Sequence, residues 1–304
     1  MAGRRLFNGV MAGLVPAIHV FDNDGKIDVD ARHRAGHDDE KVLRTMKASE
    51  LFDLKGRVAL VTGASSGLGT QFARALADNG ATVALVARRA DRLKALKDEI
   101  EGQGGKAVAI EADVTDRAAM QRAFDEAEKA FGTVTILVNN AGVAQQPVRA
   151  TDVTPEEWRR VLGVDLDAVF YWAQEGARRM VAAKKEGAIV NIASVLGLGV
   201  SKGVAAYAVA KAAVVQTTKA LALELAFKGV RVNAIAPGWF VTEINDTYLN
   251  SEAGIAMKRD IPMGRFGEAG DLDGALLLLV SNAGRYMTGA TVVVDGGQVV
   301  QLKG

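Results

Sequence analysis

The fold of this chain is decided by one stretch: Arg57-Val58-Ala59-Leu60-Val61-Thr62-Gly63-Ala64-Ser65-Ser66-Gly67-Leu68-Gly69. Its apolar, β-branched beginning predicts a buried strand over residues 58–61. A turn with three glycines follows, and the alanine-rich run from Leu68 to Asp78 predicts a helix. This layout lets backbone N–H groups approach a pyrophosphate at the helix N-terminus. The stretch therefore predicts a dinucleotide-binding turn, against the alternative of a tight strand-to-helix turn without a ligand.

Outward from this stretch, short apolar runs alternate with helical patterns along the chain, which predicts parallel βαβ units. One helix is predicted to begin at Thr154-Pro155-Glu156-Glu157, with an N-cap, a proline and a capping-box glutamate, and to continue past Asp165 toward Lys184. Another is predicted from Asp271 to Val280. The strand candidates are residues 58–61, 82–87, 107–112, 136–139, 188–193, 230–235 and 291–294. The sequence thus predicts an α/β fold, a single doubly wound parallel sheet of about seven strands flanked by helices.

The composition excludes several classes of protein. Hydrophobic residues make up 49% of the 304, and 37 basic against 36 acidic residues leave a net charge of +1, so there is no electrostatic footprint for nucleic acid. No apolar run approaches the roughly 18 to 20 residues of a membrane span. Cysteine is absent, which excludes disulfides, thiol catalysis and cysteine-ligated metals.

Tyr207 and Lys211 stand one helical turn apart in the run Tyr207-Ala208-Val209-Ala210-Lys211, with Ser194 upstream. Residues four apart share a helix face, so the Lys211 ammonium can stabilise a tyrosinate at Tyr207. A free phenol has a pKa near 10 and is a poor base at neutral pH, but a nearby desolvated cation lowers that pKa. The pattern predicts Tyr207 as an acid/base, with Ser194 hydrogen-bonding a carbonyl or alcohol oxygen. Taken alone, the same spacing would also fit an amphipathic helix without catalysis.

The histidines support this choice of base. All three lie before residue 50, at His19, His33 and His37. Their positions exclude a Ser-His-Asp hydrolase and a histidine-bound metal in the rest of the chain. We therefore expect no metal site, and the acid/base must be a residue of another type.

Together these residues resemble the short-chain dehydrogenase/reductase family, from about Leu54 to Gly297. The resemblance implies a Rossmann-like fold, hydride transfer to or from a nicotinamide, and a homo-oligomer, either a dimer or a tetramer. It implies that Ser194, Tyr207 and Lys211 form the catalytic trio. It further implies cofactor contacts in the glycine turn, at Gly63, Ser65, Ser66, Gly67, Leu68 and Gly69, and beside the adenine, at Asp113 and Val114. An Asn-Asn-Ala-Gly element that also stabilises the sheet is implied to contact the cofactor through Asn140, Ala141 and Gly142. The remaining implied contacts are Tyr207 and Lys211, and Pro237, Gly238 and Thr242 along the nicotinamide.

One catalytic position departs from the family pattern. Where the family has an asparagine in the helix after the Asn-Asn-Ala-Gly element, this chain has Asp165. An aspartate can still hold the water that relays protons toward Lys211. Its charge favours the charged lysine and is expected to alter the pH profile of an active enzyme.

The choice of cofactor is read from the end of the second predicted strand. An acidic residue there would grip the ribose hydroxyls and repel a 2′-phosphate, whereas arginine accepts the phosphate. This chain has Ala87 in place of the acid, followed by Arg88 and Arg89. Arginine donates to a phosphate through a planar fork, so NADP(H) is favoured over NAD(H). The alternative is that these arginines are solvated charges at the start of the next helix.

Residues 1–45 lie outside the resemblance. Arg4-Arg5-Leu6-Phe7 before an apolar run invites an export signal, although Pro16 interrupts the run and no small-residue cleavage site follows. The segment also looks like translated dispersed repeat DNA of bacterial genomes, which would put the functional start at Met46. A disordered or regulatory arm is the third alternative. We predict a spurious or disordered extension over residues 1–45, a catalytic domain over 46–304 and a cytoplasmic location.

The substrate is the least determined part of the prediction. In this family specificity resides after the nicotinamide segment, here from Trp239 to about Phe266, and near residues 143–148 and 196–204. We expect a mainly apolar pocket with a few polar contacts, among them Gln145 and Gln146. Such a pocket suits a small molecule: a medium-sized ketone, a 3-oxoacyl thioester or a sugar-derived ketone. No nucleic-acid or membrane partner is expected.

Three functions remain open on the sequence. The first is an NADPH-dependent oxidoreductase that interconverts a ketone and a secondary alcohol. The second is an NAD-dependent alcohol or sugar dehydrogenase, which the missing acid at Ala87 opposes. The third is a nicotinamide-binding scaffold without catalysis, which the intact Ser194, Tyr207 and Lys211 oppose and Asp165 slightly favours.

Overall fold

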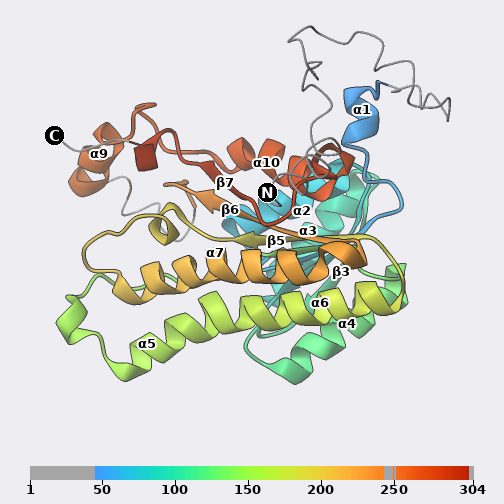
Figure 1. The fold of residues 1–304 in the computed structure, drawn as a ribbon, viewed down its shortest axis with the longest axis horizontal. Helices are drawn as coiled ribbons and strands as arrows, with labels where there is room; N and C mark the ends of the chain where they lie inside the picture. The colour runs from blue at the N-terminus through green and yellow to red at the C-terminus, as the bar shows by residue number, and fades with distance from the viewer. Residues whose placement is uncertain (1–44, 243–248, 250, 301–304) are drawn as a thin grey trace, which may run out of the picture. The chain divides into compact units, whose positions relative to one another are not determined.

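A seven-stranded parallel sheet forms the centre of the computed structural model, which describes residues 45–242, 249 and 251–300 (Figure 1). The strand order is β3-β2-β1-β4-β5-β6-β7, and every neighbouring pair is parallel. The strands are β1 Val58–Thr62, β2 Thr82–Ala87, β3 Lys106–Glu111, β4 Ile136–Asn139, β5 Gly187–Ile192, β6 Val230–Pro237 and β7 Thr291–Val294. The predicted α/β fold is confirmed, and the strands begin and end within two residues of their predicted positions.

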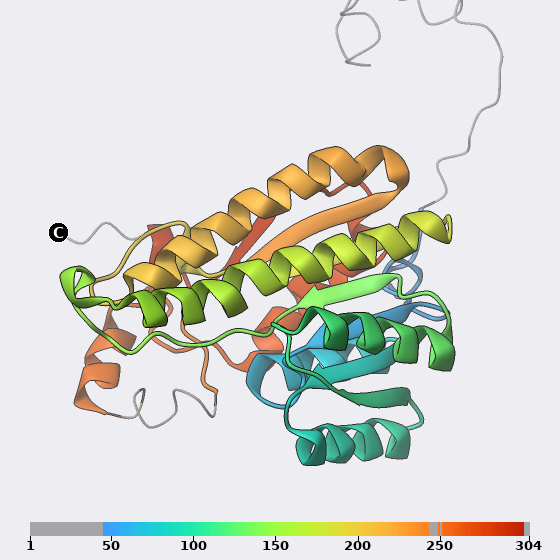
Figure 2. The same cartoon turned by 90° about the horizontal axis from the view of Figure 1, so that it is seen from below.

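Helices cover both faces of the sheet. The α-helices are α1 Ala48–Leu51, α2 Gly67–Asp78, α3 Ala90–Gly102, α4 Arg117–Phe131, α5 Pro155–Leu162, α6 Val169–Ala182, α7 Ala205–Leu225, α9 Glu252–Arg259 and α10 Asp273–Val280. Short 3-10 turns lie at Ala150–Asp152, Val195–Gly197, Ala226–Lys228, Ala269–Leu272, Asn282–Gly284 and Gln298–Val300. One face packs against α2, α3 and α10, and the other against α4, α6 and α7. Helices α6 and α7 run side by side (Figure 2).

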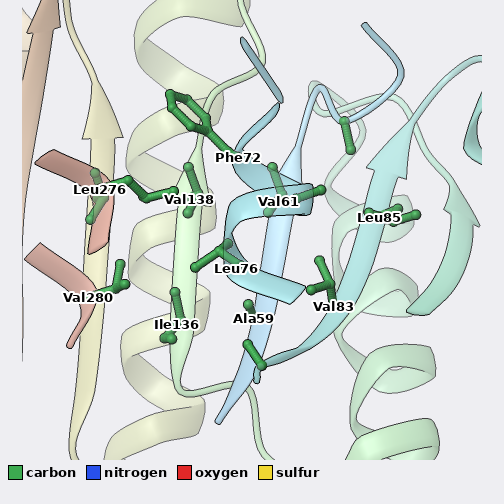
Figure 3. Packing of buried hydrophobic residues seen from close by; sticks show 14 of the residues in the cluster. Ala59, Val61, Phe72, Leu76, Val83, Leu85, Ile136, Val138, Leu276 and Val280 are labelled. Carbon is green, nitrogen blue, oxygen red and sulfur yellow. The ribbon is translucent and has the colours of Figure 1, made fainter. Parts of the chain in front are cut away.

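The central strands β1, β2 and β4 are almost wholly apolar because both of their faces are buried, whereas the edge strand β3 begins and ends with the exposed Lys106 and Glu111. On β1, Ala59 and Val61 face one core cluster, while Val58 and Leu60 face the other. Figure 3 shows Phe72 and Leu76 of α2 packed over β1 and β4. Leu276 and Val280 of α10 lie beside them in the same cluster. This two-sided packing explains why the sequence shows continuous apolar runs where a half-exposed strand would alternate.

The helix predicted from Thr154 toward Lys184 is interrupted by a wider turn. It begins as predicted, since the Thr154 hydroxyl accepts the Glu157 N–H at 3.2 Å and Pro155 is the first helical residue. The Glu157 carboxylate, predicted to complete a capping box, pairs with Arg160 at 2.7 Å. Between α5 and α6 the backbone forms a π-helical turn, Gly163–Ala168. Such turns are rare and often lie at functional sites.

The chain's contacts group residues 47–304 as one compact unit. Of the extension predicted over residues 1–45, all but the last residue lies outside the part that the structure describes, so the boundary at Met46 stays a prediction. Within the described residues, no helix is long and apolar enough to cross a membrane.

Candidate active site

The predicted site residues gather at the carboxyl edge of the sheet. Gly63 follows β1, Asn140 follows β4, Ser194 lies just beyond β5 and Gly238 follows β6. The strand order reverses where β1 lies beside β4, because β1 continues to β2 on its other side. Ligands of open α/β sheets bind outside the carboxyl ends of the strands at such a switch point.

The glycine turn after β1 has room only for glycine. Gly63 and Gly67 have φ values of 68° and 55°, a region that other residues rarely adopt. A Cβ atom on Gly63 would lie 2.9 Å from the Ala141 Cα, and one on Gly69 would lie 2.2 Å from the Gly63 carbonyl oxygen. The turn therefore brings the start of α2 tightly against the Asn-Asn-Ala-Gly element. This cradle fits the pyrophosphate of a dinucleotide, which would bind to the N–H groups at the start of α2.

The Asn-Asn-Ala-Gly element ties neighbouring strands together. The Asn140 amide donates to the Thr62 carbonyl at 3.0 Å, and the Thr62 hydroxyl accepts the N–H groups of Asn140 and Ala141, each at 3.1 Å. The Asn139 amide donates to the Asn191 side chain at 2.9 Å. These bonds join the ends of β1, β4 and β5, so the floor of the site is held by the sheet itself.

Helix α7 carries Tyr207 and Lys211 on one face. The Lys211 ammonium lies 5.5 Å from the centroid of the Tyr207 ring and donates to the Ile192 carbonyl at 3.0 Å. Ser194 begins the 3-10 turn after β5, where its hydroxyl accepts the Leu196 N–H at 3.1 Å and keeps its own hydrogen available. That turn packs directly on α7, since a Cβ on Gly197 would lie 2.6 Å from the Lys211 carbonyl oxygen. The fold thus brings the predicted trio to one place.

Asp165 contacts Lys211 directly. It lies in the π-helical turn with no exposed surface, and its Oδ1 is 3.1 Å from the Lys211 Nζ. Its other oxygen accepts the Val143 N–H at 3.2 Å. The adjoining Gly142 leaves space for this carboxylate, because a Cβ there would lie 2.7 Å from Oδ1. The structure shows an ion pair between this carboxylate and the lysine, and the relay water that the carboxylate was expected to hold stays a prediction.

The charge of Lys211 is set by this neighbourhood. Burial lowers the pKa of the ammonium, but attraction to Asp165 and to Tyr207 outweighs it, so the pKa of Lys211 is raised above its ordinary value. Lys211 is consequently a fixed positive charge across neutral pH.

The two arginines after β2 face different groups. The Arg89 guanidinium donates to the Ser65 hydroxyl at 3.2 Å and to the Ser66 hydroxyl at 2.6 Å. Arg88 lies near Asp113, whose pKa is lowered by hydrogen bonds from Thr115 and, to a smaller extent, by attraction to Arg88. Arg89 is therefore the arginine at the glycine turn, whereas Arg88 lies on the side of the predicted adenine contacts.

The remaining predicted contacts lie around this turn. A Cβ on Gly67 would lie 3.3 Å from the Thr242 Cγ2, so the segment after β6 reaches the cradle. An open hollow of about 500 Å³ adjoins it, lined among others by Ser65, Ser66, Gly67, Thr70, Arg74 and Thr242. Val114 accepts a hydrogen bond from the Trp172 indole at 3.0 Å. Residues 243–248, which belong to the segment predicted to set substrate specificity, lie outside the described residues.

Comparison with known proteins identifies the family. Residues 63–298 match the family described as enoyl-(acyl carrier protein) reductase. Galactitol 2-dehydrogenase (L-tagatose-forming) of Cereibacter sphaeroides is 42% identical over 257 residues, which cover 82% of this chain and 98% of that protein. The chain belongs to the short-chain dehydrogenase/reductase family. As a member of this family, it is an NAD(P)-dependent oxidoreductase.

Other short-chain dehydrogenase/reductase proteins extend the comparison. The 3-oxoacyl-[acyl-carrier-protein] reductase of Staphylococcus aureus is 37% identical over 240 residues, which cover 79% of this chain and 96% of that protein. The crystal structure of a gluconate 5-dehydrogenase from Burkholderia cenocepacia, in complex with NADP and tartrate, matches with a TM-score of 0.80 at 35% identity. That match covers 84% of this chain and 100% of the other. Relatives of this chain thus include enzymes named for sugars and for acyl thioesters.

One of the two glutamines predicted to contact the substrate is buried. Gln145 was grouped with Gln146, but only Gln146 is exposed, whereas Gln145 is buried and its Oε1 accepts the Tyr207 backbone N–H at 3.1 Å. Only one feature of the sequence points indirectly to this hydrogen bond. Val204, the residue before α7, has no side-chain group that could cap the helix, so a cap must come from another part of the chain.

Proposed function

We propose that this protein is an NADP(H)-dependent oxidoreductase that interconverts a ketone and a secondary alcohol, with Tyr207 as the acid/base. One observation carries the proposal: Tyr207 and the buried, charged Lys211 share a face of α7, and the turn that begins at Ser194 packs on that helix. This arrangement lies at the same sheet edge as a turn shaped for a dinucleotide.

Each residue of the trio has a separate task. The Ser194 hydroxyl donates a hydrogen bond to the substrate oxygen. Tyr207 gives a proton to that oxygen during reduction and takes it during oxidation, while the positive charge of Lys211 stabilises the phenolate that results. The nicotinamide, when bound, supplies or accepts the hydride at the substrate carbon.

The preference for NADP(H) rests on charge at the end of β2. Arg89, with the hydroxyls of Ser65 and Ser66, forms a cluster of hydrogen-bond donors beside the glycine turn. Ala87 has no carboxylate that could hydrogen-bond the ribose hydroxyls of NAD(H) or repel the 2′-phosphate of NADP(H). The gluconate 5-dehydrogenase structure was solved with NADP, which supports the same choice. The alternative is an NAD-dependent alcohol or sugar dehydrogenase, and the likeness to galactitol 2-dehydrogenase supports its substrate class but not its cofactor.

A direct assay separates these functions. The full chain and a version starting at Met46 are assayed with NADPH and NADH against ketones, 3-oxoacyl thioesters, polyols and sugar acids. We expect turnover with a higher kcat/KM for NADPH. A preference for NADH with polyols would establish the alternative, and cofactor binding without turnover of any substrate would indicate a scaffold.

We further infer that the protein assembles with copies of itself through α7. The exposed side of this helix carries Val209, Leu223 and, just beyond its end, Phe227, beside the polar Gln216, Lys219 and Glu224. Exposed apolar side chains with polar neighbours are a common composition of a contact with another protein. Light scattering should give a dimer or tetramer, and Leu223→Arg should lower the measured mass. A wild-type monomer would contradict the inference.

A further inference from the structure

Gln145 is a buried polar residue that the proposed mechanism does not use. It lies in the loop after β4, its exposed fraction is 5%, and its Oε1 accepts the Tyr207 backbone N–H at 3.1 Å. A backbone N–H can only donate, so the oxygen of the amide must be the atom that faces α7. The orientation of the Gln145 side chain is therefore fixed by Tyr207.

The start of α7 has no cap of its own. Val204 is the N-cap residue and makes no side-chain hydrogen bond to the helix, so the first N–H groups depend on other partners. Tyr207 is the third residue of α7, the position whose N–H usually bonds an N-cap side chain. Gln145 fulfils this role from 62 residues earlier in the sequence.

The loop that carries Gln145 is itself held in place. The Val143 N–H donates to Asp165, and the Ala144 carbonyl accepts from Arg160 at 2.8 Å. Further along, the Val148 N–H donates to the Gly203 carbonyl at 2.9 Å, just before α7 begins. The Gln145 oxygen is thus a fixed point against which the first turn of α7 is set.

The hydrogen bond accepted by its side-chain oxygen explains why position 145 carries a glutamine. Within the described part of the chain, the Nε2 of Gln145 is buried and has no hydrogen-bond partner. An unpaired buried donor is unfavourable. If the position only needed to be filled, methionine would fill a similar volume without that penalty. Glutamine is favoured at this position if the hydrogen bond to Tyr207 stabilises the folded protein by more than the unpaired amide nitrogen destabilises it.

We propose that Gln145 is a positioning residue for Tyr207: it caps α7 from a distant loop and holds the phenol in register with Lys211 and Ser194. The proposal rests on the function proposed above, in which Tyr207 is the acid/base. It assigns to Gln145 an effect on turnover and not on cofactor binding, because the cap acts on the turn of α7 that carries the phenol.

Three substitutions test it. Gln145→Met removes the acceptor at similar volume, Gln145→Asn keeps the amide but withdraws it by one methylene, and Gln145→Glu keeps an acceptor at the same reach. Ser281→Ala is the matched control: it removes the cap on the Ala283 N–H of a 3-10 turn beyond α10. The measurements are kcat, the dissociation constant of NADPH, the thermal midpoint and hydrogen exchange of the Tyr207 amide.

We expect the methionine and asparagine variants to lose at least about tenfold in kcat, since a misplacement of about 1 Å can cost 10²-fold. Their Tyr207 amides should exchange faster while NADPH binding changes less than twofold. Gln145→Glu should recover the amide protection and most of kcat, with kcat taken at the optimum of that variant's own pH profile because the new carboxylate lies close to Tyr207. The control should lose thermal stability only.

Two results would overturn the proposal: a kcat within twofold of wild type in the methionine variant, or equal kcat in the glutamate and asparagine variants. The second comparison decides the matter even where the methionine variant fails to fold. Failure of the proposed function is distinguishable, because it would show as near-normal activity in Tyr207→Phe, whereas failure of this inference alone would leave Tyr207→Phe inactive and Gln145→Met active.

Discussion

Replacing Asp165 by asparagine removes one charge from the middle of the site. The carboxylate is 3.1 Å from the Lys211 ammonium, which is 5.5 Å from the Tyr207 ring centroid. The negative charge of Asp165 therefore opposes the positive charge that stabilises a phenolate. If Lys211 keeps its charge through its attraction to Tyr207, it acts on Tyr207 unopposed in this variant, and the form of the enzyme that acts as a base becomes available at lower pH.

The size of this effect follows from Coulomb's law. The distance from Asp165 to the Tyr207 ring cannot exceed the two measured distances placed end to end. At that greatest distance and an effective dielectric constant of about 20, such a pair interacts by roughly 2 kcal/mol. Each pH unit corresponds to about 1.36 kcal/mol. We expect the ascending limb of the oxidative kcat profile to move about 1.5 units toward lower pH in Asp165→Asn, with substantial activity retained.

The assay is kcat against pH, with cofactor and alcohol saturating at every point. Asp167→Asn is the control, because Asp167 carries the same charge in the same π-helical turn but is exposed. Its profile should match that of wild type. An unmoved profile in Asp165→Asn, or a shift toward higher pH, would refute the reasoning. Equal activity in wild type, Asp165→Asn and Asp165→Ala would show that this position takes no part in proton transfer.

The other predictions concern the base, the cofactor, the turn and pH stability. Tyr207→Phe should lower kcat by at least about 10²-fold, the scale of a positioned acid/base, with NADPH affinity by titration nearly unchanged. Replacing Arg88 and Arg89 together by alanine should weaken NADPH by roughly 1.5 to 3 kcal/mol per lost charged hydrogen bond and leave NADH unaffected, whereas equal loss of both cofactors would point to damaged folding. Gly69→Ala should abolish cofactor binding or lower expression, because its Cβ would meet the Gly63 carbonyl oxygen at 2.2 Å. Because the pKa of Lys211 is raised in the folded protein, its contribution to stability is complete below the ordinary lysine pKa and is lost as the pH rises through the raised value. Urea unfolding of wild type and Lys211→Met should therefore give a difference in the free energy of unfolding that is constant from about pH 7 to 9. This difference should shrink above about pH 10.5.

The elements that depend on local pattern were predictable from the sequence. The central strands of a parallel sheet are buried on both faces, so they appear as unbroken apolar runs such as Val83 to Ala87. At Gly63 and Gly69 of the first turn an added Cβ would collide with backbone, and Gly67 has a positive φ that other residues rarely adopt. Tyr207 and Lys211 meet because a helix places residues four apart on one face. In each case the pattern that carries the prediction, whether an apolar run, a glycine spacing or an interval of four residues, lies within a short stretch of the chain.

Tertiary structure alone decided which groups pair with the charged residues of the site and which group caps its helix. Asp165 reaches Lys211 because a π-helical turn carries it inward, and the bonding of such a turn leaves no mark in hydrophobic periodicity. Gln145 bonds Tyr207 across 62 residues, and Arg89, rather than Arg88, meets the serines of the turn. These contacts depend on the packing of loops and helix ends against one another. Sequence periodicity determines which face of an element is buried, but the partner of a buried polar group is chosen only when distant segments come together.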